Sequence, residues 1–287
     1  MNNQPLAYFS REFLESDAGR PVRLLSEYLE PLRRFEQERI QDTVVFFGSA
    51  RTPSRARAEA ALAALRQKSG GELAGRDEAL VEQARRAVDW SRYYEDARLL
   101  ARRLTAWSRA LEAPFHRFVV CSGGGPGIME AANRGAREAG GKTIGLNIRL
   151  PMEQGPNPYI SPGLHFEFHY FFMRKFWFAY LAKALVVFPG GFGTLDEMFE
   201  ILTLVQTEKL SRRIGVILYG REYWDRVLRL EPMVEAGAIS PADLDLFSRA
   251  DTPDEAFDIL TGHLTEHVLR QEAPSDQRAP KIARTRA

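Results

Sequence analysis

Two stretches of the chain each join a short apolar run to a cluster of glycines and then to a helix-forming segment. Residues 186–188 precede the turn P-G-G-F-G-T at 189–194, and residues 118–121 precede S-G-G-G-P-G at 122–127. The pattern is typical of a buried strand that ends in a tight turn and continues into a helix. Because strand–turn–helix units build parallel sheets, we expect both turns at the carboxyl edge of one sheet.

The rest of the chain alternates in the same way. Short β-branched or aromatic runs predict strands at 43–47, 117–121, 142–147, 184–188 and 213–218, with a further short strand at 165–168. Apolar residues at helical spacing predict helices at 21–39, 127–139, 170–183, 194–208, 222–235 and 253–269. We therefore predict an α/β fold: a Rossmann-like, doubly wound parallel sheet flanked by helices, with extra N-terminal, inserted and C-terminal helices.

The alternating core defines the predicted domain organisation. Residues 41–270 are expected to form a Rossmann-like nucleotide-binding domain, and residues 1–40 a helical extension before it. Residues 54–113 are expected to be a helical insert made of two helices, with a hinge at Gly70, Gly71 and Gly75. The tail 271–287 has almost no apolar residues and is predicted to be disordered.

One apolar stripe follows the second of the inserted helices. Its members recur at helical spacing and are Trp90, Tyr93, Tyr94, Ala97, Leu100, Ala101 and Leu104. Such a stripe is typical of a protein core or a subunit interface, and much less of a cofactor site. The interface interpretation favours a homo-oligomer, a dimer or a multiple of dimers.

Charge and hydropathy narrow the classes of partner. Lys and Arg total 39 and Asp and Glu total 38, so the formal net charge is +1 and gives no electrostatic case for nucleic acid or an anionic membrane as partner. The apolar region 170–188 is interrupted by Arg174, Lys175 and Lys183 and is too polar to span a bilayer. The first residues lack the pattern of a signal peptide, and we expect a soluble, cytoplasmic protein.

Cysteine and histidine give no metal signature. Cys121 is the only cysteine, which excludes an intramolecular disulfide, and its position in a strand favours a packing role. Histidines four residues apart occur at 165 and 169 and again at 263 and 267, without the glutamate of H-E-x-x-H. We expect neither a metal site nor a cofactor.

The two glycine turns predict a phosphate site. Glycine lets the backbone turn tightly, and the free amides at a helix start can then point at an anion. The alternative is that the glycines only permit tight turns. A dinucleotide fingerprint is excluded because Ile128 and Asp196 stand where its last glycine is needed, and a P-loop is excluded because Ala136 replaces its first glycine.

Two charged residues are candidates for chemistry. Glu197 lies in the first turns of the helix after the second glycine turn, and we expect it to face the cleft with Glu200 one turn further on. The alternative is a capping box, in which Thr194 caps the helix and Glu197 bonds back to its amide. Arg174 interrupts an aromatic segment, so it is expected to pair with a phosphate or a carboxylate, unless it only extends into solvent.

The motifs together resemble a known family. Residues 189–197 fit P-G-G-x-G-T-x-x-E, Met173, Arg174 and Lys175 match an upstream Arg-Lys element, and 122–129 and 47–49 resemble the first phosphate loop and the opening strand end. The chain is similar in these features to the LONELY GUY (LOG) family of phosphoribohydrolases, which act on cytokinin riboside 5′-monophosphates and often on AMP. Its members have often been labelled lysine decarboxylases. The similarity covers 43–237 apart from 54–113, and the length is like that of the larger bacterial members.

The resemblance implies a function and a set of site residues. The expected reaction is hydrolysis of the N-glycosidic bond of a purine riboside 5′-monophosphate, which gives the free base and ribose 5-phosphate. Glu197 and Arg174 are the implied catalytic residues. Residues implied in holding the 5′-phosphate are Gly124, Gly125, Gly127, Gly191, Gly193 and Thr194. Residues implied elsewhere in the substrate pocket are Ser49, Met173, Lys175 and Glu200.

Two further expectations remain open at this point. The loop at 151–159 is expected to help line the pocket. The alternative function is a non-catalytic one, a nucleotide-binding or molybdenum-cofactor carrier protein of the same fold, in which Glu197 only caps its helix. The expected partner in either case is a small phosphorylated molecule.

Overall fold

A computed structural model describes residues 5–68, 76–150, 155–209 and 214–271 of the chain. Within these residues the strands form one seven-stranded sheet in the order β4-β3-β2-β1-β5-β6-β7, and every neighbouring pair is parallel. The strands are β1 (Thr43–Phe47), β2 (Val119–Ser122), β3 (Thr143–Ile148), β4 (His165–Phe168), β5 (Ala182–Val187), β6 (Gly215–Tyr219) and β7 (Ser248–Ala250).

The order of the strands reverses in the middle of the sheet. From β1 the chain moves outward through β2 and β3 to β4, and it then returns to the other side of β1 with β5, β6 and β7. In open parallel sheets, ligands bind beyond the carboxyl ends of the strands at the point where the winding direction reverses. That point lies between β1 and β5 in this chain.

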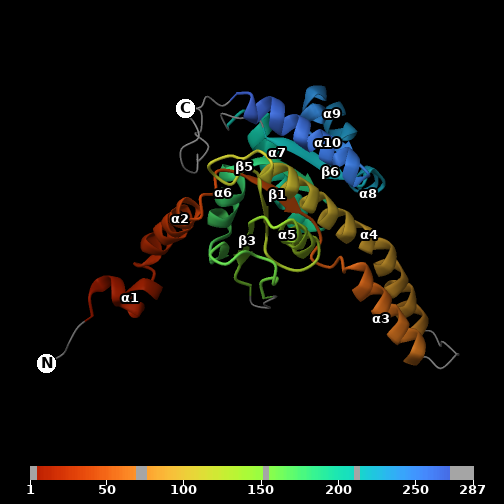
Figure 1. Cartoon of the computed structure of the whole chain (residues 1–287), viewed down its shortest axis with the longest axis horizontal. Coiled ribbons are helices and arrows are strands. Elements are labelled where there is room, and N and C mark those ends of the chain that lie inside the picture. Colours follow the sequence, from red (N-terminus) through yellow and green to blue (C-terminus); the bar gives the residue numbers. More distant parts are fainter. Residues whose placement is uncertain (1–4, 69–75, 151–154, 210–213, 272–287) are drawn as a thin grey trace.

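Helices cover both faces of the sheet (Figure 1). The helices are α1 (Arg11–Glu15), α2 (Arg20–Gln37), α3 (Arg55–Lys68), α4 (Arg76–Arg109), α5 (Ile128–Glu138), α6 (Phe171–Leu181), α7 (Phe192–Gln206), α8 (Arg221–Val227), α9 (Glu231–Glu235) and α10 (Pro253–Leu264). Short 3-10 helices at Ala7–Phe9 and Pro241–Leu246 and a π-helical turn at Thr265–Leu269 complete the described elements.

The central strands β1, β2, β5 and β6 contribute to two separate cores because their side chains alternate between the faces. Val45 and Phe47 of β1 pack in a cluster with side chains of α2, α6, α7 and α8. Val44 and Phe46 point the other way, into a cluster with α4, α5 and α10. This arrangement confirms the predicted doubly wound α/β fold.

The segment that was expected to be an insert is part of this architecture. Helix α4 is the crossover between β1 and β2, and its C-terminal half packs on the sheet beside α5, while α3 and the start of α4 form a hairpin that extends away from the sheet (Figure 1). Six members of the apolar stripe, all except the partly exposed Trp90, are buried in the cluster with α5 and α10. The interface interpretation of the stripe is therefore wrong, and the stripe gives no argument for an oligomer.

Two other details differ from the sequence-based expectations. The helix predicted at 222–235 is two helices, α8 and α9, because Pro232 lies in the first turn of α9 and a proline inside a continuous helix would remove a backbone hydrogen bond. Strand β7 was not predicted. The expected glycine hinge, residues 151–154 of the expected pocket loop, and all but the first residue of the expected tail lie outside the described residues.

No loop separates α6 from β5. Helix α6 ends at Leu181 and β5 begins at Ala182, whose backbone is already extended (φ −65°, ψ 135°). The helix that carries Arg174 and the strand that leads to the second glycine turn are thus consecutive in the chain. None of the helices within the described ranges is both long enough and apolar enough to cross a membrane.

Candidate functional site

The loops that follow β1, β2 and β5 are hydrogen-bonded to one another at the carboxyl edge of the sheet. The amide of Ser49, after β1, donates to the carbonyl of Pro189, after β5, at 3.0 Å. The amide of Ile128, the first residue of α5, donates to the carbonyl of Ser49 at 3.1 Å. These bonds join the loops that carry expected site residues at the carboxyl ends of β1, β2 and β5.

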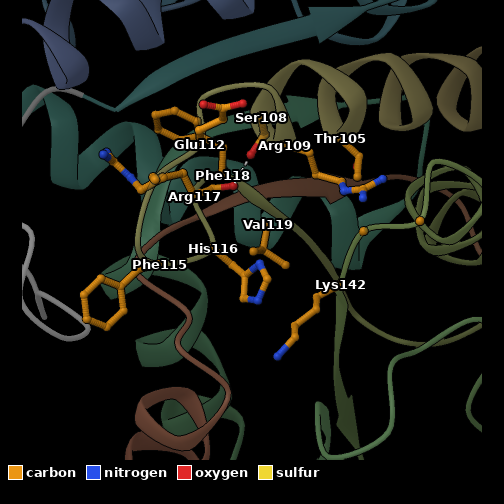
Figure 2. Close-up of a pocket in the computed structure, with 13 residues that line it drawn as sticks. Thr105, Ser108, Arg109, Glu112, Phe115, His116, Arg117, Phe118, Val119 and Lys142 are labelled. Carbon is orange, nitrogen blue, oxygen red and sulfur yellow. Dashed lines mark hydrogen bonds between the residues drawn. The ribbon is translucent and has the colours of Figure 1, made fainter.

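A cavity of about 370 Å³ lies at the opposite edge, where β2 and β3 begin (Figure 2). Its lining includes the cations Arg117 and Lys142, and both already have carboxylate partners. Arg117 Nε is 2.8 Å from Asp42 Oδ2, and Lys142 Nζ is 2.6 Å from Glu38 Oε2. None of the expected site residues lies there, so this cavity belongs to a different part of the molecule.

The glycine loop after β2 is buried and bonded internally. The amide of Gly124 donates to Ser122 Oγ at 3.1 Å, and its carbonyl accepts from both the backbone amide and Nδ2 of Asn157. Gly124 also has a φ of +74°, in the left-handed region that favours glycine. The amide of Gly124 is thus bonded within the protein in this structure, and its role in holding a phosphate stays a prediction.

Two asparagines hold this loop. Asn157 belongs to the segment 151–159 that was expected to line the pocket, whereas Asn133 was not singled out in the sequence. Asn157 Nδ2 donates to the carbonyls of Gly124 and Gly125 and to Asn133 Oδ1. Asn133 Oδ1 also accepts from Ser122 Oγ at 2.7 Å. The partners of Asn157 lie 24 to 33 residues away in the sequence, and only tertiary packing brings them together.

Gly127 has a positional role. It precedes α5 with a φ of +68°, and a Cβ on this residue would lie 2.3 Å from the carbonyl oxygen of Ser49. Only glycine permits this close approach of two backbones. Gly127 therefore joins the loops after β1 and β2, and Ser49 is held by backbone bonds on both sides, with its Oγ accepting from the amide of Arg51 at 3.1 Å.

The glycine loop after β5 is open by contrast. Gly191 and Gly193 are exposed, and a Cβ on either would meet nothing within 4 Å. Helix α7 begins at Phe192, so Gly191 is its N-cap and the amides of its first turn face outward with no side-chain cap. The helix N-terminus can therefore accept an anion.

The capping-box alternative for Thr194 and Glu197 is wrong. The helix starts two residues before the expected position, and Thr194 lies within its first turn with a buried side chain. Thr194 Oγ1 packs against Gly190, where a Cβ would be only 2.1 Å away. The carbonyl of Gly190 is fixed from the other side by the hydroxyl of Tyr223 at 2.6 Å.

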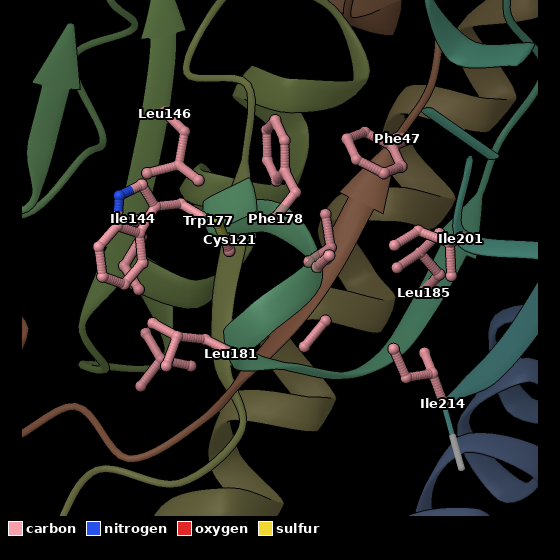
Figure 3. Close-up of a cluster of buried hydrophobic side chains, with 14 of the residues drawn as sticks. Phe47, Cys121, Ile144, Leu146, Trp177, Phe178, Leu181, Leu185, Ile201 and Ile214 are labelled. Atoms are coloured by element: carbon pink, nitrogen blue, oxygen red, sulfur yellow. The ribbon is translucent and has the colours of Figure 1, made fainter. Parts of the chain in front are cut away.

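Glu197 instead pairs with Arg174. Arg174 Nη1 is 2.8 Å from Glu197 Oε1, and the two side chains are 10% and 13% exposed. Arg174 Nε donates to the carbonyl of Leu146 in β3 at 2.7 Å, which fixes the guanidinium between α7 and the sheet. Trp177 and Phe178 of α6 pack with Leu146 of β3 in the apolar cluster on this face of the sheet (Figure 3).

The environment of Glu197 changes its acidity. Burial raises the pKa of Glu197 above the ordinary value of 4.5, and the positive charges of Arg174 and Lys175 oppose this effect. Burial disfavours the charged form, while a cation at hydrogen-bonding distance favours it. The pair therefore holds a carboxylate that is more basic than an exposed glutamate.

The neighbouring expected residues form a second contact between α6 and α7. Lys175 Nζ is 2.8 Å from Asp196 Oδ1 and 3.3 Å from Glu200 Oε2. Met173 is partly buried and packs against the cluster below α6. Glu200 therefore does not share the pair of Arg174 and Glu197 but anchors Lys175 beside it.

Comparison with known proteins gives similar relatives over about half of the chain. A family model described as "Possible lysine decarboxylase" matches residues 129–260. The probable cytokinin riboside 5′-monophosphate phosphoribohydrolase LOG6 of Arabidopsis thaliana is 28% identical over 149 residues, 52% of this chain and 74% of the relative. LOGL3 of Oryza sativa subsp. japonica, named as a probable enzyme of the same kind, is 30% identical over 94 residues, 33% of this chain and 44% of the relative.

Other matches are more distant or shorter. The cytokinin riboside 5′-monophosphate phosphoribohydrolase LOG3 of Arabidopsis thaliana is 26% identical over 139 residues, 48% of this chain. The match spans 63% of that relative, so the chain covers less than two thirds of LOG3 and of LOGL3. A solved structure of the Moco carrier protein from Chlamydomonas reinhardtii is 16% identical, with a TM-score of 0.42, and the match covers 79% of this chain and 99% of that one.

Proposed function

From its confirmed similarity to the LOG family, carried by the matched model and the curated relatives, we propose that this chain hydrolyses the N-glycosidic bond of purine riboside 5′-monophosphates. The products are the free base and ribose 5-phosphate. The substrates we propose are AMP and N6-substituted, cytokinin-type analogues of AMP.

The observation that carries the proposal is the buried ion pair of Arg174 and Glu197 beside an open helix N-terminus. A protein that only binds a phosphate needs the helix start but not a buried carboxylate next to it. Burial of ionised groups is costly even when they are paired, and such groups are concentrated at functional sites. The carboxylate therefore favours a reaction over simple binding.

We propose that the 5′-phosphate lies at the N-terminus of α7. The amides of Gly193 and Thr194 lie in its first turn, and the exposed Gly191 and Gly193 leave room for the anion. Helix starts bind anions through free N–H groups and the positive end of the helix dipole. In the other loop, we propose that Gly125 faces the substrate while Gly124 and Gly127 shape the backbone around it.

The proposed chemistry follows from the charge that develops on the sugar. As the bond between C1′ and the base nitrogen breaks, C1′ becomes positive, and water adds its oxygen to C1′. Glu197 stabilises this positive charge and accepts the proton that the water loses, and its raised pKa suits that role. The departing base takes up one proton at its nitrogen, which balances the reaction.

Arg174 has a different role in the proposal. A guanidinium keeps its proton in proteins, so it cannot serve as the acid for the leaving base. Its bonds to Glu197 and to the carbonyl of Leu146 fix the orientation of the carboxylate. We propose that Lys175, held by Asp196 and Glu200, adds positive charge that keeps Glu197 ionised.

The test is to incubate the purified protein with AMP and with N6-prenyl-AMP and to measure free base and ribose 5-phosphate. Release by the wild type, lost in Glu197→Gln, is the expected result. Release of the base that persists in Glu197→Gln would remove Glu197 from the mechanism. Binding of nucleotide without release would instead favour a nucleotide-binding or molybdenum-cofactor carrier protein.

A further inference from the structure

Helix α6, which carries Arg174, begins without a cap from its own sequence. Its N-cap is Tyr170, whose side chain makes no capping hydrogen bond. Glu27 of the neighbouring α2 lies at this helix start (Figure 1). Its Oε1 accepts from the amide of His169 at 2.7 Å, and its Oε2 accepts from the amide of Tyr170 at 3.3 Å. A carboxylate at this place also meets the positive end of the helix dipole. The N-terminal extension therefore supplies the group that holds the start of α6.

Tyr170 is held by α2 at two further points. Arg23 Nε donates to the hydroxyl of Tyr170 at 3.2 Å, and the guanidinium of Arg20 lies 5.7 Å from the centre of its ring. Tyr170 itself is only 9% exposed. One residue at the start of α6 thus contacts α2 through its backbone amide, its ring and its hydroxyl.

Helix α2 also holds α6 further along. Trp177 Nε1 donates to the backbone carbonyl of Glu27 at 2.9 Å. The centre of the Trp177 ring lies 5.8 Å from that of Tyr28 and 5.3 Å from that of Phe35, both of which belong to α2. The contacts with α2 therefore lie on both sides of Arg174 along the helix.

Arg174 is one hydrogen bond away from the first of these contacts. Its backbone amide donates to the carbonyl of Tyr170 at 3.2 Å, and its Nη1 lies 2.8 Å from Glu197 Oε1. Hydrogen bonds thus connect Glu27 with the buried ion pair through the backbone of the first turn of α6. A misplacement of about 1 Å in a group that acts at a reaction centre can cost about 100-fold in rate, even when its cause is distant.

We propose that Glu27 is a positioning residue for the reaction: by holding the start of α6, it keeps the guanidinium of Arg174 in place against Glu197. This inference rests on the function proposed above. Glu27 touches neither the substrate nor Glu197 in this proposal and acts only through α6. The N-terminal extension, which the sequence set apart from the nucleotide-binding domain, is then required for full activity.

The first test needs no turnover. The glutamate carboxyl groups are labelled with carbon-13, and the signal of Glu197 is identified by its loss in Glu197→Gln. Its titration is then followed by NMR in the wild type, in Glu27→Ala and in a control, Glu36→Ala. Glu36 is exposed on the same helix α2, so the control removes an equal charge away from α6.

The expected change has a definite sign. The charges of Arg174 and Lys175, both on α6, lower the pKa of Glu197, whereas the two neighbouring carboxylates of α7 raise it. Displacement of α6 weakens the first effect and leaves the second in place. The pH of half-titration should therefore rise by about 0.5–1 in Glu27→Ala and stay unchanged in the control. An unchanged titration in Glu27→Ala would overturn the proposal.

The second test uses the reaction. For hydrolysis of AMP, kcat should fall about tenfold in Glu27→Ala, while KM should change by less than about twofold, because we place the phosphate at α7 and not at α6. The loss of activity at low pH should begin at a higher pH, as in the titration. A purely structural role would reduce the amount of folded protein, so the rate would fall by one factor at every pH. That result would contradict the proposal.

A milder substitution covers the case in which Glu27→Ala does not fold. Glu27→Gln has nearly the same size but loses the charge and one of the two acceptor oxygens. Its kcat should fall about threefold, and the titration of Glu197 should move in the same direction. Wild-type kcat and titration in this variant would also overturn the proposal. Absence of AMP hydrolysis by the wild type would overturn the proposed function itself, and the titration would still report whether Glu27 sets the ion pair.

Discussion

The loops after β2 and after β5 share the pattern of strand, glycine cluster and helix, yet the fold uses them in opposite ways. In the first loop the amide and carbonyl of Gly124 are bonded to Ser122 and Asn157. In the second, Gly191 and Gly193 contact nothing on their open side. The first loop is thus held by hydrogen bonds within the protein, whereas the second leaves open space at the N-terminus of a helix.

The difference shows what a glycine cluster does and does not establish. Glycine permits a backbone conformation, and the side chains that pack against the loop decide whether its amides bond to the protein or stay free. Glu197 and Arg174 belong to the open side, because α7 follows the second loop directly. Four experiments test this contrast, in order of decreasing effect.

The largest expected effect is at Glu197, in the helix that follows the open loop after β5. Glu197→Gln should lower kcat for nucleotide hydrolysis by about 1,000-fold, because the neutral amide neither stabilises positive charge nor accepts a proton. The measurement is release of base from AMP. Asp196→Asn, one residue away and 59% exposed, is the matched control and should keep most of the activity.

The pH dependence sharpens the role of the open side. Burial raises the pKa of Glu197 above the ordinary value of 4.5. As the pH falls, the carboxylate should therefore take up a proton, and activity should be lost, at a higher pH than for an ordinary glutamate. On this acidic limb of the pH profile, below the pKa of Glu197, the rate of nucleotide hydrolysis should fall about tenfold per pH unit. Lys175→Ala removes a charge that lowers this pKa and should move the limb to still higher pH, whereas Lys175→Arg should not. If the pH at which activity is lost does not change in Lys175→Ala, the titrating group is not Glu197.

A matched pair of glycine substitutions compares the two loops in stability. Gly124→Ala requires a φ of +74° and places a Cβ against Asn147, so we expect the free energy of unfolding to fall by about 2–4 kcal/mol. Gly191→Ala adds a Cβ in open space at a φ of −96° and should change it by less than about 0.5 kcal/mol. Urea unfolding gives both values. Equal losses would mean that the second loop is as tightly held as the first.

The smallest expected effect separates the bonds that hold each loop. Asn157→Ala removes hydrogen bonds to two carbonyls of the first loop and should cost about 2 kcal/mol. Tyr223→Phe removes one bond to Gly190 and should cost about 1 kcal/mol. Thermal unfolding of both variants provides the comparison. A larger loss for Tyr223→Phe would place the main structural support at the second loop.

The fold was largely predictable because its signals are local. Buried strands such as 43–47 read as continuous apolar runs, and the glycines mark the strand ends. Arg174 stood out because a charge in an apolar segment needs a partner. Glu197 stood out because it follows the second glycine turn at the start of a helix, and the family resemblance implied Arg174 as its basic partner. Asn133 was missed, and Asn157 was predicted only as part of the loop 151–159, because an isolated asparagine has no periodicity and its bonds depend on distant neighbours.

The errors have the same physical origin. The local pattern T-x-x-E suggested Thr194 as a possible helix cap. In the structure Gly191 is the N-cap and the helix begins at Phe192. The sequence left open whether the apolar stripe on α4 packs in the core or at a subunit interface, since the apolar face of a helix does not show what covers it. Its burial against α5 and α10 depends on the crossover between β1 and β2, which no local pattern records.

The direct junction between α6 and β5 limits how this chain can change in length. One inserted residue there would either turn α6 by about 100° relative to the sheet or exchange the two faces of β5. The first outcome would carry Arg174 away from Glu197, and the second would turn Leu185 and Val187 out of their core. Insertions and deletions should therefore be absent between 174 and 189 in functional descendants of this chain, while substitutions of similar size remain tolerable.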